Sequence, residues 1–442
     1  MHVPDLTHPS LITRRRFGRT LAAAGAALGL PASVVAATNP SVSFAAEAAA
    51  WRRHLVERTI PYWLGTVDPT GGYALSDDAV RGRTDPWEKQ VVSQARMVWG
   101  LALAHRRGLC PGSQACLLAA QHGVLYLRSR MRDPVHGGYY FAVQPDGSPR
   151  DPRKLVYGQA FVMYALVEWF RASGDQAALG DAMELYQLLQ RRAHDASRGG
   201  WTEHFERDWT PLPLRAPNAI VEVAGLKSAN THLHLLEAFT ELHSETRDPG
   251  VRASLAESIR LNQRHFYPRD ASRSAFHFHP DWSPVDDPAS AGLSYGHNVE
   301  FAWLMIRAEE SLGRRPSWGH FHGHLEHCLR RGTDDVRGGI YNRGMRDEPA
   351  SDTTKVWWAQ AEWIAALTDG LRHKPGHAPY VAALRRVLAF MRDHATDART
   401  GIWLDTVAAD GTPRSTGLAH SWKTLYHDTR GLLKFVEAFG NV

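Results

Sequence analysis

One turn motif recurs along the chain and constrains its fold more than any other feature. An aspartate, a glycine-rich turn and an aromatic residue follow one another in DPTGGY from Asp68, DPVHGGYY from Asp133, DASRGGW from Asp195, DVRGGIY from Asp335 and DARTGIW from Asp397. A degenerate copy, DASRSAF, begins at Asp270, in the wide gap between the third and fourth copies. Six copies at spacings of roughly 60 to 75 residues leave room in each unit for two helices and a short hairpin. Six such units predict a closed ring.

The segments between these turns have the pattern of helices. Apolar residues recur at three- and four-residue spacing in 91–108, 154–175, 231–246, 296–313 and 355–373. The glycines of the turns supply positive φ angles, which short hairpins need. We therefore predict an all-α (α/α)6 barrel of six inner and six outer helices, with short β-hairpins at one rim and the active site at one end. Six unrelated turns with common turn residues, the alternative, do not account for the regular period.

The N-terminus has the organisation of an export signal. Consecutive arginines in TRRRFGRT, residues 13–20, precede the apolar and small residues LAAAGAALGLPASVVAA. This order is typical of a twin-arginine signal peptide, and the short apolar run with Pro31 disfavours a permanent membrane anchor. We predict a signal peptide and short linker over residues 1–45, a single catalytic barrel over 46–442, and export to the periplasm or the extracellular space.

Composition excludes several classes of partner. The formal net charge is +5, much of it from the N-terminal arginines, and no long basic run follows, so nucleic-acid binding and stable membrane insertion are not expected. Cys110, Cys116 and Cys328 contain no CxxC pair and form no metal knuckle, and the sequence leaves open whether Cys110 and Cys116 are bonded or unpaired. Fifteen Trp and 24 His suit a pocket that binds a small sugar. A monomer and a homodimer both remain open.

Three histidines in different units have a charged residue three positions later, and such residues are neighbours on a helix surface. The pairs are His234 with Glu237, His297 with Glu300, and His427 with Arg430. Any one of them fits a hydrogen-bonded helix histidine, but the recurrence favours acid–base chemistry with unequal pKa values. His232 has no such partner and is predicted to pack or to satisfy a backbone group. A metal site formed by His232, His234 and His297 is disfavoured, because residues two apart lie on different helix faces.

Further side chains complete the predicted pocket. Arg96 is expected to hold an anionic oxygen by charge-assisted hydrogen bonds, and Glu362 is a supporting carboxylate. The candidates for sugar binding are Asn230, Tyr157, Trp357, Trp358 and Trp422. Tryptophan faces stack on pyranose rings, although one ring of the adjacent Trp357 and Trp358 is expected to belong to the core.

Several of these segments resemble a known family. KSANTHLHLLEAFTEL, SYGHNVEFAWLM, KVWWAQAEW, LVYGQAFVMYALVEW and WKTLYHDTRG are similar to motifs of the N-acylglucosamine 2-epimerase superfamily, which includes cellobiose 2-epimerases, mannose isomerases and sulfoquinovose isomerase. The resemblance runs from about Arg96 to Arg430. It implies an (α/α)6 barrel and proton transfer at C2 of an open-chain reducing sugar, without a metal or a cofactor.

The resemblance also implies roles for individual residues. The two acid–base histidines fall on His297 and His427, a third, linked with ring opening and positioning, falls on His234, and the family's arginine falls on Arg96. Glu300 is then expected to orient His297, while Arg430 and the backbone near Asp428 frame His427. The reaction passes through a cis-enediolate, and reprotonation at C2 gives an epimer whereas reprotonation at C1 gives a ketose.

The sequence leaves alternatives for the activity. The form of the NTHLHLLEA motif favours a cellobiose 2-epimerase-like enzyme, and a mannose isomerase-type enzyme is the alternative. A more distant alternative is a glycoside hydrolase with a carboxylate pair drawn from Glu300, Glu362, Asp352 and Asp405. A sugar-binding protein on an inactive scaffold is disfavoured, because the three histidines and Arg96 are all present.

Overall fold

The computed structural model describes residues 40–440, apart from 113, 218–219 and 221–222. The chain divides into two units, Met1–Thr38 and Asn39–Val442, and the second contains all the elements described below. The predicted twin-arginine segment lies outside the described residues. Within them, no helix is both long and apolar enough to cross a bilayer.

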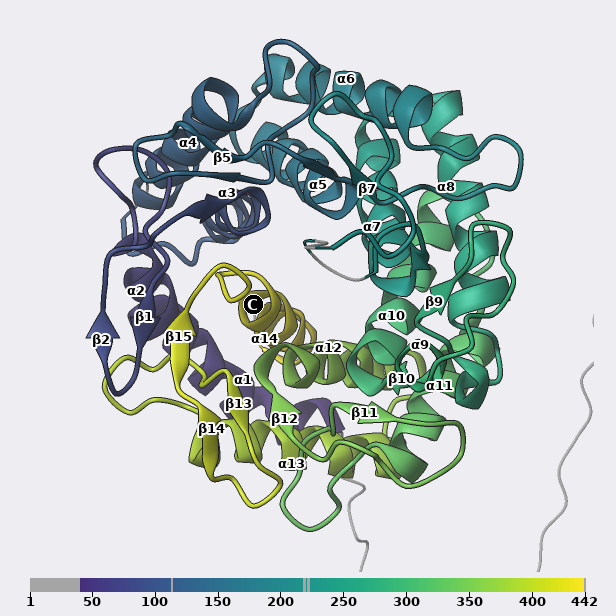
Figure 1. Ribbon diagram of the computed structural model, residues 1–442. Coiled ribbons are helices and arrows are strands. Elements are labelled where there is room, and N and C mark those ends of the chain that lie inside the picture. The colour runs from purple at the N-terminus through teal and green to yellow at the C-terminus, as the bar shows by residue number, and fades with distance from the viewer. Residues whose placement is uncertain (1–39, 113, 218–219, 221–222, 441–442) are drawn as a thin grey trace, which may run out of the picture. The chain divides into compact units, whose positions relative to one another are not determined.

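The second unit is a double ring of helices (Figure 1). The inner ring, within the described residues, consists of α3 (Val91–Arg106), α5 (Val156–Ser173), α7 (Ala229–Thr246), α10 (Tyr295–Ser311), α12 (Trp357–His373) and α14 (His427–Phe439). The outer ring consists of α1 (Pro40–His54), α4 (Ala115–Tyr126), α6 (Gln176–Arg192), α8 (Pro249–Leu261), α11 (Trp318–Arg331) and α13 (Ala378–His394). This arrangement and its likeness to solved (α/α)6 barrels, reported below, confirm the predicted fold class.

The ring closes where α14 meets α3. The ring of Trp99 contacts the ring of Tyr426 edge-on, with centroids 5.1 Å apart. A Cβ atom on Gly100 would lie 2.0 Å from the Leu425 carbonyl oxygen, so only glycine allows this close approach of the two segments.

The remaining elements are short. The helical ones are η1 (Leu55–Thr59), α2 (Ile60–Leu64), η2 (Leu127–Met131), η3 (Asn262–Phe266), η4 (Ala271–Arg273) and α9 (Pro288–Ala291). The strands are β1 (Asp77–Asp78), β2 (Gly82–Arg83), β3 (Lys89–Gln90), β4 (Ala142–Val143), β5 (Pro149–Asp151), β6 (Lys154–Leu155), β7 (His204–Phe205), β8 (Lys227–Ser228), β9 (His277–Phe278), β10 (Leu293–Ser294), β11 (Arg343–Gly344), β12 (Lys355–Val356), β13 (Thr406–Val407), β14 (Pro413–Ser415) and β15 (Gly417–Ala419).

The strands form small antiparallel sheets at one end of the barrel, in front of the helices in Figure 1. Their orders are β15-β1-β2, β3-β4-β5, β6-β7, β8-β9, β10-β11 and β12-β13-β14. In five of them one strand runs directly into an inner helix, as β6 runs into α5. The sheets therefore fix the N-terminal ends of inner helices at this end, which we call the hairpin end.

The recurring turns are built alike. In the second copy the Asp133 N–H donates to the Gly138 carbonyl at 2.8 Å, and a single antiparallel bridge between Arg132 and Tyr139 closes the turn. In the fourth copy Asp334 takes this position instead of the predicted Asp335, because the Asp334 N–H donates to the Gly339 carbonyl at 3.1 Å. The predicted start of that copy was therefore wrong by one residue.

A lysine two residues before an inner helix anchors four of the five complete turns. These lysines are buried, and each forms an ion pair with the aspartate that begins the turn. The Nζ–Oδ2 distances are 2.7 Å for Lys89–Asp68, 2.9 Å for Lys154–Asp133, 3.1 Å for Lys227–Asp195 and 2.8 Å for Lys355–Asp334. The same ion pair thus links the outer half of one repeat to the inner helix of the next.

Five positions after the lysine, a second side chain holds the backbone of the turn. Gln159 accepts a hydrogen bond from the Tyr139 N–H at 2.8 Å and donates to its carbonyl at 2.9 Å. Gln94 and Gln360 do the same in their repeats. We call this position the clamp.

His232 occupies the clamp position in the third repeat. Its Nε2 accepts from the Trp201 N–H at 3.2 Å, and its Nδ1 donates to the Ser228 carbonyl at 2.8 Å. Gly200, with φ of +80°, leaves the space for the imidazole, since a Cβ there would lie 2.8 Å from Nε2. Both nitrogens of His232 are used within the fold, so it satisfies a backbone group and is not available to a metal site with His234 and His297.

The first and last long helices of the described chain, α1 of the outer ring and α14 of the inner ring, pack against each other. Phe44 of α1 is fully buried, and its ring lies 5.7 Å from that of Phe435 and 5.0 Å from that of Phe439 in α14. Helix α1 therefore crosses the predicted boundary at residues 45 and 46, and the packed barrel begins before it. A chain cut after residue 45 would lose this aromatic contact.

The cysteines separate into a pair and a single residue. Cys110 and Cys116 form a disulfide that spans the connection between α3 and α4. Cys328 is buried and free in α11. The pairing left open by the sequence is thus formed in the structure.

Candidate functional site

Each inner helix contributes one residue to a common layer of the barrel interior. The position is seven residues after the anchoring lysine, or after its counterparts Leu293 and Lys423. Its occupants are Arg96, Phe161, His234, Glu300, Glu362 and Arg430. We call them the central layer. Five of the six, all but Phe161, are charged or titratable, and such side chains are placed in a core only with partners.

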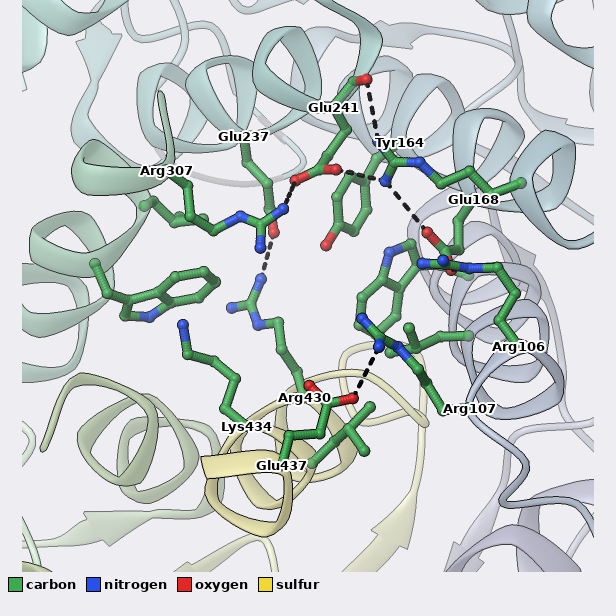
Figure 2. A pocket seen from close by; sticks show the side chains of 16 residues that line it. Arg106, Arg107, Tyr164, Glu168, Glu237, Glu241, Arg307, Arg430, Lys434 and Glu437 are labelled. Atoms are coloured by element: carbon green, nitrogen blue, oxygen red, sulfur yellow. Dashed lines mark hydrogen bonds and ion pairs between the residues drawn. The ribbon is translucent and has the colours of Figure 1, made fainter. Parts of the chain in front are cut away.

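Arg430 is the centre of this layer. Its guanidinium donates to Glu237, to Glu300 at 2.5 Å and to Glu362 at 2.7 Å, and all four side chains are almost completely buried. Figure 2 shows Arg430 reaching from α14 toward Glu237 of α7. One cation therefore holds three carboxylates from three other helices.

Two of these carboxylates, Glu237 and Glu300, have pKa values shifted in opposite directions. Burial and the neighbouring Glu362 raise the pKa of Glu300 well above its usual value, despite the attraction of Arg430. Burial also opposes ionisation of Glu237, but Arg430 and His234 outweigh it and lower its pKa to about 2. Glu237 thus keeps its charge, whereas Glu300 keeps a proton over a wider pH range than a free glutamate.

His427 is oriented by a carboxylate from the neighbouring helix. Its Nδ1 lies 2.7 Å from Glu362 Oε1, and the other oxygen of Glu362 accepts from the Trp303 indole at 3.0 Å. This contact leaves Nε2 for a ligand. Burial, with the positive charges of Arg96 and Arg430, lowers the pKa of His427 well below its usual value, so the ring is neutral at neutral pH.

His234 is held within its own helix, as its sequence spacing predicted. Its Nδ1 lies 2.9 Å from Glu237 Oε2, and the Tyr426 hydroxyl donates to the same carboxylate at 2.7 Å. The rings of Tyr157 and Phe161 pack on the imidazole with centroids at 5.2 and 4.7 Å. Burial lowers the pKa of His234, and its bond to Glu237 partly offsets this effect.

His297 lies at the first turn of α10, at the hairpin end, and is partly exposed. The Trp358 ring lies between the two predicted acid–base groups, with its centroid 4.6 Å from the His297 ring and 5.7 Å from the His427 ring. The Nδ1 atom of His297 has no hydrogen-bond partner among the described residues. Removal from water and the charges of His234 and Arg343 lower its pKa well below the usual value.

The predicted contact between Glu300 and His297 is not formed. Glu300 is three positions along the helix, but its Oε1 accepts from Arg430 instead. The buried guanidinium is the stronger partner, because an uncompensated charge inside the barrel costs more than an unpaired neutral imidazole at its edge. Likewise, Glu362 rather than Arg430 makes the hydrogen bond to His427.

Arg96 has a different environment from Arg430. It donates to the Tyr157 hydroxyl at 2.7 Å and to the Trp422 carbonyl at 3.2 Å, and its guanidinium lies 4.2 Å from the centre of the Phe161 ring. No carboxylate among the described residues pairs with it. Arg96 is therefore a buried cation whose charge is not cancelled.

The aromatic candidates divide between site and core. Trp358 and Trp422 are partly exposed. Tyr157 is buried beside Arg96, and Asn230 is buried at the start of α7. Trp357 is also buried, and the ammonium of Lys423 lies 5.4 Å from the centre of its ring. Trp357, predicted to bind sugar, thus packs in the wall, and its neighbour Trp358 is the member of the pair that contacts the histidines.

The carboxylates of the hydrolase alternative do not form a catalytic pair. Asp352 accepts from Asn342 and Thr354, and Asp405 lies 2.8 Å from His420, all in the connections at the hairpin end. Glu300 and Glu362 are fully buried and share the Arg430 guanidinium. Two carboxyl groups that flank a glycosidic bond must both be reachable by the sugar, and these are not.

One group of side chains within the described residues has the spacing of metal ligands. Single ligand atoms of Glu300, Glu362 and His427 all lie within 4.8 Å of one another. Arg430 already donates to both carboxylates, so its positive charge occupies the place that a cation would take.

The opposite end of the barrel is lined by ion pairs. A cavity there, with about 600 Å³ of empty space, has Glu237 and Arg430 in its wall (Figure 2). Glu241 binds Arg171 at 2.5 Å and Arg307 at 2.7 Å across it. The partly exposed rings of His297, Trp358 and Trp422 all belong to the hairpin end, so His297 is accessible from that side.

The structure adds three contacts that the sequence interpretation did not contain. These are the bond between Glu362 and His427, the Trp303 indole on Glu362, and the Tyr426 hydroxyl on Glu237. Alignment of the repeats on their lysines would have placed Glu362 in the same layer as His234 and Arg430. No local spacing links Glu362 to His427, which is 65 residues away.

Comparison with known proteins identifies sugar epimerases and isomerases as relatives of this chain. A cellobiose 2-epimerase from Ruminococcus albus is 28% identical over 400 residues, covering 87% of this chain and 97% of the relative. A D-mannose isomerase from Thermobifida fusca is 29% identical and covers 86% of this chain and 91% of the relative. The structure of cellobiose 2-epimerase from Spirochaeta thermophila superposes with a TM-score of 0.80 at 30% identity, covering 91% of this chain and 98% of that one.

More distant structures share the fold alone. A GH76 α-mannanase from Bacteroides thetaiotaomicron superposes with a TM-score of 0.59 at 10% identity. The family profile is more specific, because its match spans residues 71–430 and so includes every member of the central layer. The chain belongs to the N-acylglucosamine 2-epimerase (GlcNAc 2-epimerase) family, and it is a carbohydrate epimerase or isomerase.

Proposed function

We propose that this protein is a sugar 2-epimerase of the cellobiose 2-epimerase type, which moves a proton at C2 of a free reducing sugar by means of His297 and His427. The observation that carries the proposal is the arrangement of two neutral imidazoles around Trp358, with ring centroids at 4.6 and 5.7 Å from the indole. A reaction that inverts C2 needs one proton acceptor and one proton donor on opposite faces of the carbon.

The chemistry follows from the partners of each histidine. His297 takes the C2 proton of the open-chain aldose, the C–H electrons form the C1–C2 double bond, and the carbonyl electrons move to O1. His427, in its minor charged form, then gives a proton to the opposite face of C2, where the electrons of the C1–C2 double bond form the new C–H bond and the C1 carbonyl is restored. Glu362 on Nδ1 supports that charged form. In the reverse direction the two histidines exchange roles.

The negative charge of the enediolate needs a cation. Arg96 is suited to this task, because it has no carboxylate partner among the described residues and is surrounded by aromatic rings. His234 lies against Tyr157, which is itself bonded to Arg96, so His234 is placed to position the sugar and to assist ring opening. No step requires a metal or a cofactor.

Deuterium exchange tests the proposal. The purified protein is incubated in D2O with cellobiose, mannose, glucose, mannobiose or an N-acetylated hexosamine, and NMR follows the C2 signal. Incorporation of deuterium at C2 is expected for at least one of these sugars. Cleavage of a glycoside without exchange in any reducing sugar would overturn it in favour of a hydrolase.

The same experiment separates the two kinds of product. The relatives named above include both a cellobiose 2-epimerase and a D-mannose isomerase, and the two reactions share an enediolate. An epimer with deuterium at C2 supports the proposal, whereas a ketose with deuterium at C1 would assign the isomerase alternative.

We also propose that the protein is exported by the twin-arginine route to the periplasm or the extracellular space. The arginine pair and apolar run of residues 13–37 support this, and the Cys110–Cys116 disulfide suits an oxidising compartment. Fractionation of cells that produce the full chain is expected to recover a shortened protein that retains Phe44. Lysine in place of both Arg15 and Arg16 should leave it in the cytoplasm, and unchanged export of that variant would contradict the route.

A further inference from the structure

Six histidines lie far from the proposed catalytic groups, around helix α11 and the connection between α12 and α13. They are His320, His322, His324, His327, His373 and His377. Most make hydrogen bonds that the fold explains, such as His320 Nε2 to the Tyr267 carbonyl at 2.8 Å and His327 Nε2 to the Arg346 carbonyl at 3.0 Å. The pair His322 and His373 is different, because the two imidazoles face each other directly.

The separation of this pair is close to that of two ligands on one ion. His322 Nε2 lies 2.9 Å from His373 Nδ1. Two imidazole nitrogens bound at about 2.0 to 2.1 Å to one zinc ion lie about 3.0 to 3.4 Å apart, depending on the angle at the metal. A shift of a few tenths of an ångström would therefore convert the hydrogen-bonded pair into a chelating one.

Both rings are already held in the orientation that binding requires. The Tyr380 hydroxyl lies 2.8 Å from His322 Nδ1, which fixes that buried ring with Nε2 directed at His373. The Trp318 indole stacks on His373 with centroids 4.0 Å apart and planes 8° from parallel. Hydrogen bonding of the far nitrogen of a histidine ligand is a common feature of metal sites.

An ion can reach the pair from solvent. The His373 side chain is exposed, and with Trp318 it lines a surface cavity with about 740 Å³ of empty space. His377, the residue before α13, packs on Tyr380, with ring centroids 4.4 Å apart. Lys374, the residue after His373, is a positive charge that limits the affinity.

We propose that His322 and His373 form a binding site for a divalent transition-metal ion of the zinc class, with water in the remaining positions. The ion would join the end of α12 to α11. This site is separate from the catalytic group of Glu300, Glu362 and His427 and does not depend on the proposed sugar chemistry.

Calorimetric titration of the tag-free full chain with zinc chloride at neutral pH tests the proposal. One zinc ion per chain is expected, with a dissociation constant in the micromolar range. The variant His373→Asn should weaken binding at least tenfold. The matched control is His136→Asn, an exposed histidine of the second turn, which should bind zinc as the wild type does.

Two outcomes would overturn the proposal. One is the absence of binding at a zinc concentration of about 100 μM, where a micromolar site is saturated. The other is equal binding by the wild type and His373→Asn. Loss of zinc binding in His427→Asn, with His373→Asn unaffected, would instead move the ion to the catalytic group and would equally refute the site proposed here.

Discussion

Replacement of His232 by glutamine tests directly whether His232 is equivalent to the clamp residues of the other repeats, because glutamine occupies the clamp position in three of them. Gln94, Gln159 and Gln360 each accept from a turn N–H and donate to the carbonyl of the same residue. A glutamine at position 232 can make both bonds to Trp201. We therefore expect His232→Gln to fold normally and to differ from the wild type by no more than about 1 kcal/mol at neutral pH.

The difference should appear at acid pH. Burial lowers the pKa of His232 from its usual value of 6.5 to about 3 in the folded protein. Between these two values the unfolded chain binds a proton that the folded protein does not, so the free energy of unfolding falls as the pH decreases below 6.5. At pH 5 this one group costs the wild type about 2 kcal/mol, at about 1.4 kcal/mol for each pH unit. Glutamine does not titrate and avoids the loss.

Urea unfolding followed by tryptophan fluorescence at pH 7.5 and pH 5.0 measures the effect. The free energy of unfolding of His232→Gln, relative to the wild type, should rise by about 2 kcal/mol between the two conditions. The exposed His136 provides a control, since His136→Gln should follow the wild type at both pH values. If the free energy of unfolding of His232→Gln depended on pH as that of the wild type does, His232 could not be a buried, neutral clamp residue.

Four further results are expected at the site. Glu362→Gln should slow C2 exchange about 100-fold, or about 2.7 kcal/mol in activation free energy, because one amide cannot accept from all three donors that surround it. It should also shift the pH profile of exchange. The control Glu257→Gln, which breaks a Glu–His contact of the outer wall, should change neither the rate nor the pH profile. His427→Asn should abolish exchange while circular dichroism and sugar binding are retained, and surviving turnover would refute its role. Since the reaction needs one neutral and one charged histidine, and the pKa values of His297 and His427 are both lowered, kcat/KM should pass through a maximum on the acid side of pH 6.5. Exhaustive chelation should leave C2 exchange unchanged, and loss of activity that zinc restores would contradict a metal-free reaction.

The sequence was informative about the fold because its signals are local. The turn motif and the apolar period of each inner helix lie within short segments, and the predicted segment 91–108 corresponds to α3, Val91–Arg106. The fourth turn was placed one residue late, because two adjacent aspartates fit the motif equally well. The backbone hydrogen bond to Gly339 and the ion pair with Lys355 distinguish Asp334 from Asp335, and both are known only from the structure.

The same distinction explains the outcome at the site. The contact between His234 and Glu237 was predicted because both lie on one turn of one helix. The contact of His427 with Glu362 was not, since it joins two helices. The spacing rule failed for Glu300, where Arg430 competes for the carboxylate. A residue three positions away is a possible partner, but charge balance in the buried layer selects the actual one.

Equivalent positions of the central layer hold residues with different surroundings. Its six positions have equivalent places in their repeats, yet two of them hold arginines with opposite surroundings. Arg430 is neutralised by carboxylates, so it supports the framework that orients His234 and His427. Arg96 meets only a hydroxyl, a carbonyl and aromatic rings, so its charge remains available to an anionic intermediate. An arginine at a layer position therefore does not by itself indicate a role in binding the intermediate. Arg430 is bonded to two carboxylates of its own layer and to Glu237, whereas Arg96 has none among the described residues, and this difference is the reason to propose that role for Arg96.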